Sequence, residues 1–220
     1  MKLEDFKNML ETGKYGDLKP FLRMEVRNKA NLSPNTYYNT IIGDIVSVLT
    51  FQTTLDDDRL VTATLNKTLT ESLGDSVLEL LDDARSNTPC NFKIDRLFDI
   101  VKRNILHENQ NLTQYTLDYI DTLIDTDNPL DSIIVVNIDT STRVSILQFP
   151  KLLRYVYSKI GNYYIVPSSV YEVFIIPQSK ISDIDHVNEI IQYVNATTVD
   201  DKDILGHKLL KYNLLGLSEC

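Results

Sequence analysis

The spacing of apolar residues changes about halfway along this chain, and the change limits the folds that the chain can adopt. Before the polar run 125–131, apolar residues repeat mostly at the spacing of one helix face. After this run, short segments rich in β-branched residues alternate with helical ones. We therefore expect an α+β fold, with a mixed or antiparallel sheet of about five strands and helices mainly on one face.

The first half is expected to be mainly helical. Ser33-Pro34 offers a hydroxyl N-cap followed by a first-turn proline, and the apolar spacing after it predicts a helix to about Phe51. Residues 60–65 alternate imperfectly and predict a strand, whereas residues 19–29 fit a strand or a loose helix equally well. The same reasoning predicts further helices over residues 3–11, 76–88, 94–105 and 113–124.

The second half is expected to hold most of the sheet. Pro150 and Gly161 bracket a helical stripe, and Asp183 or Asp185 can cap a later helix. Strands are predicted over residues 132–138, 143–147, 163–166, 171–176 and 208–214, the last at a sheet edge, with a turn of helix over 200–205.

The run 125–131, which contains Asn128-Pro129, is the strongest break in the middle of the chain. It could separate two subdomains. We favour a single α+β domain over residues 1–220, because the first half offers one clear strand and a lone strand must join a sheet elsewhere.

The charge balance bears on the partner. A net charge of -9 and a pI near 4.8 argue against nucleic acid, because phosphate contacts need clustered Lys and Arg. Lys151, Arg154 and Lys159 lie on or near one predicted helix. Such a group of cations is more often a solvent-exposed helix face than a nucleic-acid patch.

The cellular compartment is inferred from the targeting and disulfide features that the sequence lacks. No stretch approaches the roughly 20 apolar residues of a membrane span, and residues 1–6 lack the apolar core of a signal peptide. Cys90 and Cys220 are too few for a disulfide framework. We expect a cytosolic protein with reduced cysteines and no membrane partner.

The sequence contains no nucleotide-binding, nucleophile-elbow or zinc motif, so no catalytic, metal-binding or cofactor-binding residue is assigned, and no cofactor is expected. Asp183, Asp185 and His186, with Glu189 nearby, could ligate a metal, although helix capping explains the acids more simply. Cys90 could act as a nucleophile with His107 or His186 as the base, but an inert thiol is the commoner state.

Two groups of residues are candidates for function. Pro167, Ser168, Ser169 and Glu172 form a turn after an apolar strand, which could present hydroxyls at a sheet end or satisfy local backbone groups. Tyrosines concentrate in the last third, where they suit a contact surface because they bury area and keep a polar tip. The candidate contact residues are Tyr155, Tyr163, Tyr164 and Tyr171.

The Pro167-Ser168-Ser169-x-x-Glu172 pattern lies between two apolar runs within residues 162–177. This segment resembles the signature of a bacterial domain family of unknown function, which occurs in chromosomes, mobile elements and phages of low-GC Gram-positive gut bacteria. Residues 80–89, 137–160 and 194–212 agree with the family in order, and Ser33-Pro34 is a weaker echo. The resemblance covers about two thirds of the chain, mostly after Leu60. The family usually has His at the place of Tyr171 and a Ser-Asp pair at that of Gly206-His207, so the resemblance does not carry over to this chain any chemistry that needs that His.

The leading hypothesis is a non-enzymatic accessory or interaction protein of a phage or mobile element, either a virion component or a modulator of a host factor. Its partner would be a phage or host protein, or a second copy of itself. One alternative is an enzyme or small-molecule binder that uses the turn at Ser168-Ser169 with Glu172. Another is an acidic anti-defence mimic of nucleic acid, although the acids are dispersed at helix starts and turns.

Overall fold

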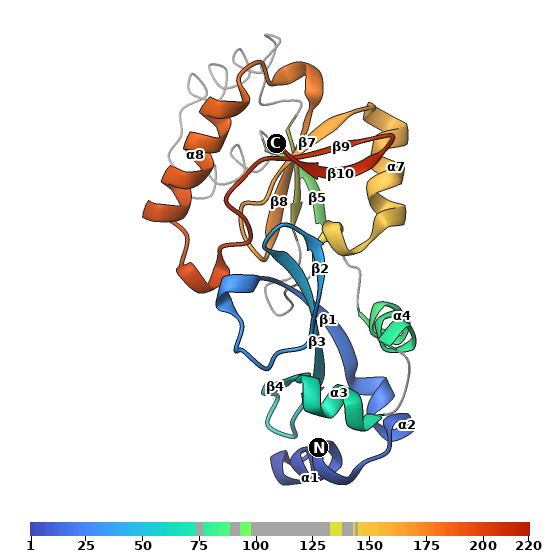
Figure 1. Cartoon of the computed structure of the whole chain (residues 1–220). Coiled ribbons are helices and arrows are strands. Elements are labelled where there is room, and N and C mark those ends of the chain that lie inside the picture. The colour runs from blue at the N-terminus through green and yellow to red at the C-terminus, as the bar shows by residue number, and fades with distance from the viewer. Residues whose placement is uncertain (74–76, 89–92, 98–132, 138–142, 144) are drawn as a thin grey trace, which may run out of the picture. The chain divides into compact units, whose positions relative to one another are not determined.

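A computed structural model describes residues 1–73, 77–88, 93–97, 133–137, 143 and 145–220 (Figure 1). The contacts divide the chain into two compact units. Unit 1 comprises Met1–Asn91 with Ser141–Val144, and unit 2 comprises Phe92–Thr140 with Ser145–Cys220. The break expected at 125–131 lies outside the described residues, and the single domain stays a prediction.

Unit 1 is built on a four-stranded antiparallel sheet in which β3 is central. Its strands are β1 (Leu22–Asn28), β2 (Tyr38–Ile42), β3 (Ile45–Thr54) and β4 (Leu60–Thr64). One long edge of β3 pairs with β1, while β2 and β4 pair with different parts of β3. Leu22, Met24 and Val26 alternate along β1 and are buried, as expected for one apolar sheet face.

The helix predicted from Ser33-Pro34 to Phe51 is wrong, because this segment forms β2 and β3. From Ile45 to Phe51 every residue of β3 is buried, so apolar residues occur at helical spacing as well as at strand spacing. Such a run cannot be assigned from periodicity alone. Two features favour the hairpin: β-branched residues are restricted in helices, and Gly43 turns the chain with φ +52°.

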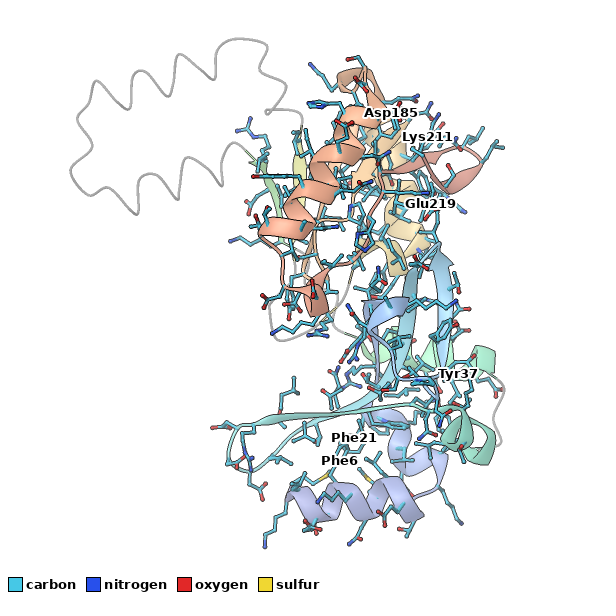
Figure 2. The ribbon with its side chains drawn as sticks, turned by 60° about the vertical axis from the view of Figure 1, so that its left-hand side comes forward. Phe6, Phe21, Tyr37, Asp185, Lys211 and Glu219 are labelled. Carbon is cyan, nitrogen blue, oxygen red and sulfur yellow. The ribbon has the colours of Figure 1, made fainter. Side chains whose placement is uncertain are left out.

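Four helices flank this sheet. They are α1 (Leu3–Thr12), α2 (Tyr15–Leu18), α3 (Lys67–Leu73) and α4 (Val77–Asn87), of which α1 and α4 confirm predicted helices. Figure 2 shows Phe6 of α1 close to Phe21, and the two rings meet edge to face at 6.4 Å. Thr88 ends α4, and its buried hydroxyl accepts a hydrogen bond from the Met24 amide at 2.8 Å, which joins the helix end to β1.

Unit 2 holds a six-stranded antiparallel sheet in the order β10-β9-β7-β8-β6-β5. The strands are β5 (Lys93–Arg96), β6 (Ile134–Asn137), β7 (Tyr163–Val166), β8 (Glu172–Pro177), β9 (Leu210–Asn213) and β10 (Gly216–Glu219). Strands β6 to β9 confirm four predictions, although β10 and not β9 forms the edge. The start of the helix predicted over 94–105 is a strand instead, and 98–105 lies outside the described residues, as does the helix predicted over 113–124.

The strand predicted over 143–147 is also wrong. Residues Ile146–Gln148 form a short 3-10 helix, and the buried side chains of Ser145 and Gln148 cap each other's backbone. The cap satisfies two amide groups that a strand would have paired with a neighbour. A hydroxyl three residues before a glutamine was the signal for this turn.

Two long helices cover opposite faces of the six-stranded sheet. The α7 helix (Pro150–Ile160) packs on the face that carries Tyr163, whose hydroxyl donates to the carbonyl of Leu153. The α8 helix (Ile184–Thr197) packs on the other face, where Ile191 contacts Tyr164. Gly161 ends α7 at φ +72°, and Asp183 caps α8 by accepting from the His186 amide at 3.0 Å, as predicted.

The α+β class and the antiparallel pairing are confirmed. The strands divide between two sheets, where the sequence predicted one of about five strands with helices mainly on one face. In the part of the chain that the structure describes, no helix is long and apolar enough to cross a membrane.

Candidate functional site

The Pro167-Ser168-Ser169 turn joins β7 to β8, and its polar groups bond within the turn. The Ser168 hydroxyl lies 3.3 Å from Oε1 of Glu172, and Oγ of Ser169 accepts from the Tyr171 amide at 3.2 Å. The Ser169 amide donates to the carbonyl of Glu172 at 3.1 Å. Both hydroxyls therefore serve the conformation of the corner, in the manner of serine turns elsewhere.

A further bond ties this turn to the segment after α8. The amide of Val170, a buried residue at the middle of the turn, donates to the carbonyl of Asp203 at 2.9 Å. Asp203 ends the short 3-10 helix Asp201–Asp203, which lies in the turn of helix predicted over 200–205. The corner is thus fixed from two directions.

The four candidate contact tyrosines occupy different environments. Tyr155 lies on α7 with 59% of its surface exposed, and Tyr171 is half-buried in the turn before β8. Tyr163 and Tyr164 are buried, because they point to opposite faces of β7 and a helix covers each face. Their position in the core removes both from any surface of the folded unit.

An aromatic stack connects α7 to the strands beneath it. The rings of Tyr163 and Tyr212 are parallel at 5.1 Å, and the ring of Tyr157 on α7 lies 6.1 Å from that of Tyr212. The Tyr163 hydroxyl donates to the carbonyl of Leu153 at 2.9 Å, and burial raises the pKa of Tyr163 well above its usual range. Helix α7 and strand β9 are therefore held together by three aromatic side chains.

Two leucines project from the tip of the β9–β10 hairpin. Leu214 and Leu215 are 82% and 97% exposed. The tip has a defined conformation, because Oδ1 of Asn213 accepts from the Leu215 amide at 2.8 Å and Gly216 takes φ +116°. The exposure of these two leucines was not predicted from the sequence. Its signal is the tetrad Asn213-Leu214-Leu215-Gly216, whose outer residues are turn formers and whose inner residues are apolar.

The outer face of α7 is basic. Lys151, Arg154 and Lys159 are exposed, and the ammonium group of Lys159 lies 5.3 Å from the centre of the Tyr155 ring. The helix contains no Asp or Glu, and no ion pair links these three cations to any side chain that the structure describes. We call Lys151, Arg154, Tyr155 and Lys159, together with Leu214 and Leu215, the α7–hairpin surface.

A buried carboxylate that was not predicted from the sequence lies in unit 1. Glu25 on β1 is 5% exposed, and its Oε2 accepts from both Nη2 and Nε of Arg27, at 2.6 and 3.0 Å. Its Oε1 accepts from Nε2 of Gln52 at 2.9 Å. Three hydrogen bonds from two partner side chains satisfy this carboxylate, which is the arrangement of a structural ion pair.

Within the described parts of the chain, no arrangement supports the metal site or the reactive thiol. No group of three or more His, Cys, Asp or Glu side chains gathers among the residues that the structure describes. Asp183 caps α8, and His186 faces Glu189 at 3.8 Å on the exposed side of that helix. Burial raises the pKa of the Cys220 thiol, while Cys90 and His107 lie outside the described residues.

Comparison with known proteins identifies a family whose function is unknown. No curated protein and no solved structure matches the chain significantly. One family profile, described as a family of unknown function (DUF5688), matches residues 22–213. The match begins well before Leu60, so it includes the four-stranded sheet of unit 1, and it continues through unit 2 to the end of β9. Because this profile spans most of the 220 residues, the chain belongs to the DUF5688 family of unknown function.

Proposed function

We propose that this chain is a non-enzymatic interaction protein and that it binds another protein through the α7–hairpin surface of unit 2. The single observation that carries the proposal is the almost complete exposure of Leu214 and Leu215 on a hairpin of fixed conformation. A buried leucine contributes about 1.5–3 kcal/mol relative to an exposed one, so an adjacent exposed pair is a favourable anchor for a partner.

The surroundings of the two leucines support a contact role. The Tyr157–Tyr212–Tyr163 stack holds β9 against α7, so the tip and the outer face of α7 belong to one rigid region. Rigid surfaces lose little conformational entropy on binding. Tyr155 adds an exposed ring with a polar end, which is a side chain that interfaces favour.

We propose in addition that the protein acts in a phage or mobile genetic element, as a virion component or a modulator of a host factor. The resemblance of the Pro167-to-Glu172 segment to a family with such members supports this setting. Mass spectrometry of purified particles and of host lysate tests it. Recovery of the chain in particles, or bound to one host protein, is expected, whereas its absence from both contradicts the setting.

Site-specific cross-linking tests the contact role. A photo-reactive phenylalanine analogue replaces Leu215 in the full chain, and a control chain carries it at Lys67, an exposed residue of unit 1. After irradiation in cells of the source organism, we expect one or a few discrete protein adducts from position 215 that are missing at position 67. Identical adduct patterns, or none from position 215, would contradict the proposal.

A further inference from the structure

We infer that the α7–hairpin surface takes an acidic polypeptide segment that also carries apolar side chains. The inference rests on the proposed contact function and adds the chemistry of the partner. The first ground is charge. In a chain of net charge -9, α7 carries Lys151, Arg154 and Lys159 and no acidic residue. A cationic face on an acidic protein attracts anionic groups locally and steers them to that face.

The second ground is the placement of the apolar residues. Leu214 and Leu215 follow β9 directly, and β9 is joined to α7 through Tyr212 and Tyr157 at 6.1 Å. Figure 1 shows the β9–β10 hairpin beside α7. A segment lying on α7 with its carboxylates over the cations can therefore place apolar side chains against the two leucines.

Two charged residues of the β9–β10 hairpin, Lys211 and Glu219, lie away from the hairpin tip. Lys211 lies opposite Tyr164 in the β7–β9 register, so it is on the face of the sheet that α8 covers; Figure 2 marks it with Glu219. Glu219 lies opposite Leu210, and Leu210 lies opposite Ile165, so Glu219 is on the sheet face that α7 covers, at the far end of β10 from the hairpin tip. Its carboxylate is therefore separated from Leu214 and Leu215 by the length of β10.

Two other anionic partners fit less well. A nucleic-acid backbone has no apolar groups to cover Leu214 and Leu215, and the net charge of -9 repels a dense row of phosphates. A lipid surface would need an apolar helix face to insert. On α7, Leu153 is buried and the other Leu, Val and Ile side chains are half-buried, so the helix has no exposed apolar face to insert. Both partners are nevertheless distinguishable in the same experiment.

The test uses the full chain and a short fluorescent peptide in which Glu and Leu alternate. One matched peptide replaces every Glu with Gln, and another replaces every Leu with Ser. Fluorescence anisotropy should give tighter binding for the Glu-Leu peptide than for either matched peptide. Binding should weaken as salt is raised, because exposed charges are screened over about 10 Å at 0.1 M ionic strength.

Variants locate the site. The exposed pair Lys151→Glu/Arg154→Glu should raise the dissociation constant about tenfold, and Leu214→Ser/Leu215→Ser should raise it by a similar factor. The control pair Lys14→Glu/Lys67→Glu makes the same change of charge on exposed residues of unit 1 and should leave binding at this surface nearly unchanged. The milder pair Lys151→Gln/Arg154→Gln repeats the test should charge reversal impair folding.

The outcomes separate the two proposals. The proposal of an acidic partner is overturned if the Glu and Gln peptides bind equally, or if the test and control pairs have equal effects. It is also overturned if oligo-dT or anionic phosphatidylserine vesicles bind more tightly than the Glu-Leu peptide. Cross-linking at Leu215 that persists alongside such a result leaves the contact function standing. Failure of that cross-linking, with acid-selective binding retained, would instead overturn the physiological contact role.

Discussion

Asn195, near the end of α8, donates a hydrogen bond from Nδ2 to the backbone carbonyl of Gly206 at 2.9 Å. The amide is 6% exposed, and the segment that it holds contains buried Leu205. One residue on from that carbonyl, Nδ1 of His207 lies 3.4 Å from the same nitrogen. Asn188, two turns earlier on α8, accepts from the amide of Leu209 at 2.7 Å. Two asparagines on one helix face therefore hold the chain that enters β9, and with it the hairpin of the α7–hairpin surface.

Asn195→Ala should lower the free energy of unfolding by about 1–3 kcal/mol, because it leaves a buried carbonyl without its donor. Denaturant unfolding followed by circular dichroism measures the change. Gln192→Ala, at an exposed position of the same helix, is the control and should change stability by less than about 0.5 kcal/mol. Equal effects of the two substitutions would show that the Gly206 bond contributes nothing.

Tyr163→Phe should cost about 1 kcal/mol, since it removes the hydrogen bond to the carbonyl of Leu153 and keeps the ring stacked on Tyr212. Tyr155→Phe, on the exposed face of α7, is the matched control and should be close to neutral. Thermal unfolding of the two variants and of the wild type measures both changes in stability.

The same tyrosine predicts a pH dependence. Burial raises the pKa of Tyr163 in the folded state, so its contribution to stability is complete below the ordinary tyrosine pKa of about 10 and is lost as pH rises above it. The free energy of unfolding, measured at increasing alkaline pH, should fall less steeply for Tyr163→Phe than for the wild type. Parallel curves would contradict the assignment.

The sequence predicted the elements that carry local signals. Pro150 and Gly161 mark both ends of α7, and Asp183 marks the start of α8. The β2–β3 hairpin escaped prediction because both faces of β3 are buried, which removes the alternation that identifies a strand. Burial on both sides is a consequence of tertiary packing and leaves no separate mark in the sequence.

The candidate surface could be predicted only in part. The basic outer residues of α7 and Tyr155 follow from helical spacing once Pro150 and Gly161 are recognised. The burial of Tyr163 and Tyr164 required knowing that helices cover both faces of β7. The exposure of Leu214 and Leu215 depends on a two-residue hairpin turn, and apolar residues at such a position run against the usual polar composition of turns.

Asp83 on α4 should stabilise unit 1 at neutral pH and lose that effect in acid. Lys19, at 2.9 Å, and the hydroxyl of Tyr15, at 2.8 Å, hold the pKa of the Asp83 carboxyl below its usual range. A lowered folded-state pKa gives a contribution that is complete above the ordinary carboxyl pKa and is lost as pH falls through the lowered one. Asp83→Asn should therefore flatten the acid side of the stability curve, while the control Asp82→Asn, in an exposed pair with Arg85, should leave it steep.

The Glu25–Arg27 pair offers the largest predicted effect in the molecule. Arg27→Ala leaves the carboxylate of Glu25 buried with one remaining donor from Gln52, and such a loss costs about 3–5 kcal/mol. Replacing both partners with valine, a residue suited to a strand, removes the uncompensated charge and should recover most of that loss. Denaturant unfolding of Arg27→Ala, of the single variants Arg27→Val and Glu25→Val, and of the double valine variant measures the loss and the coupling. Additive losses would contradict a pair whose partners depend on each other, whereas recovery in the double variant would show that the buried charge is tolerated only because Arg27 is beside it.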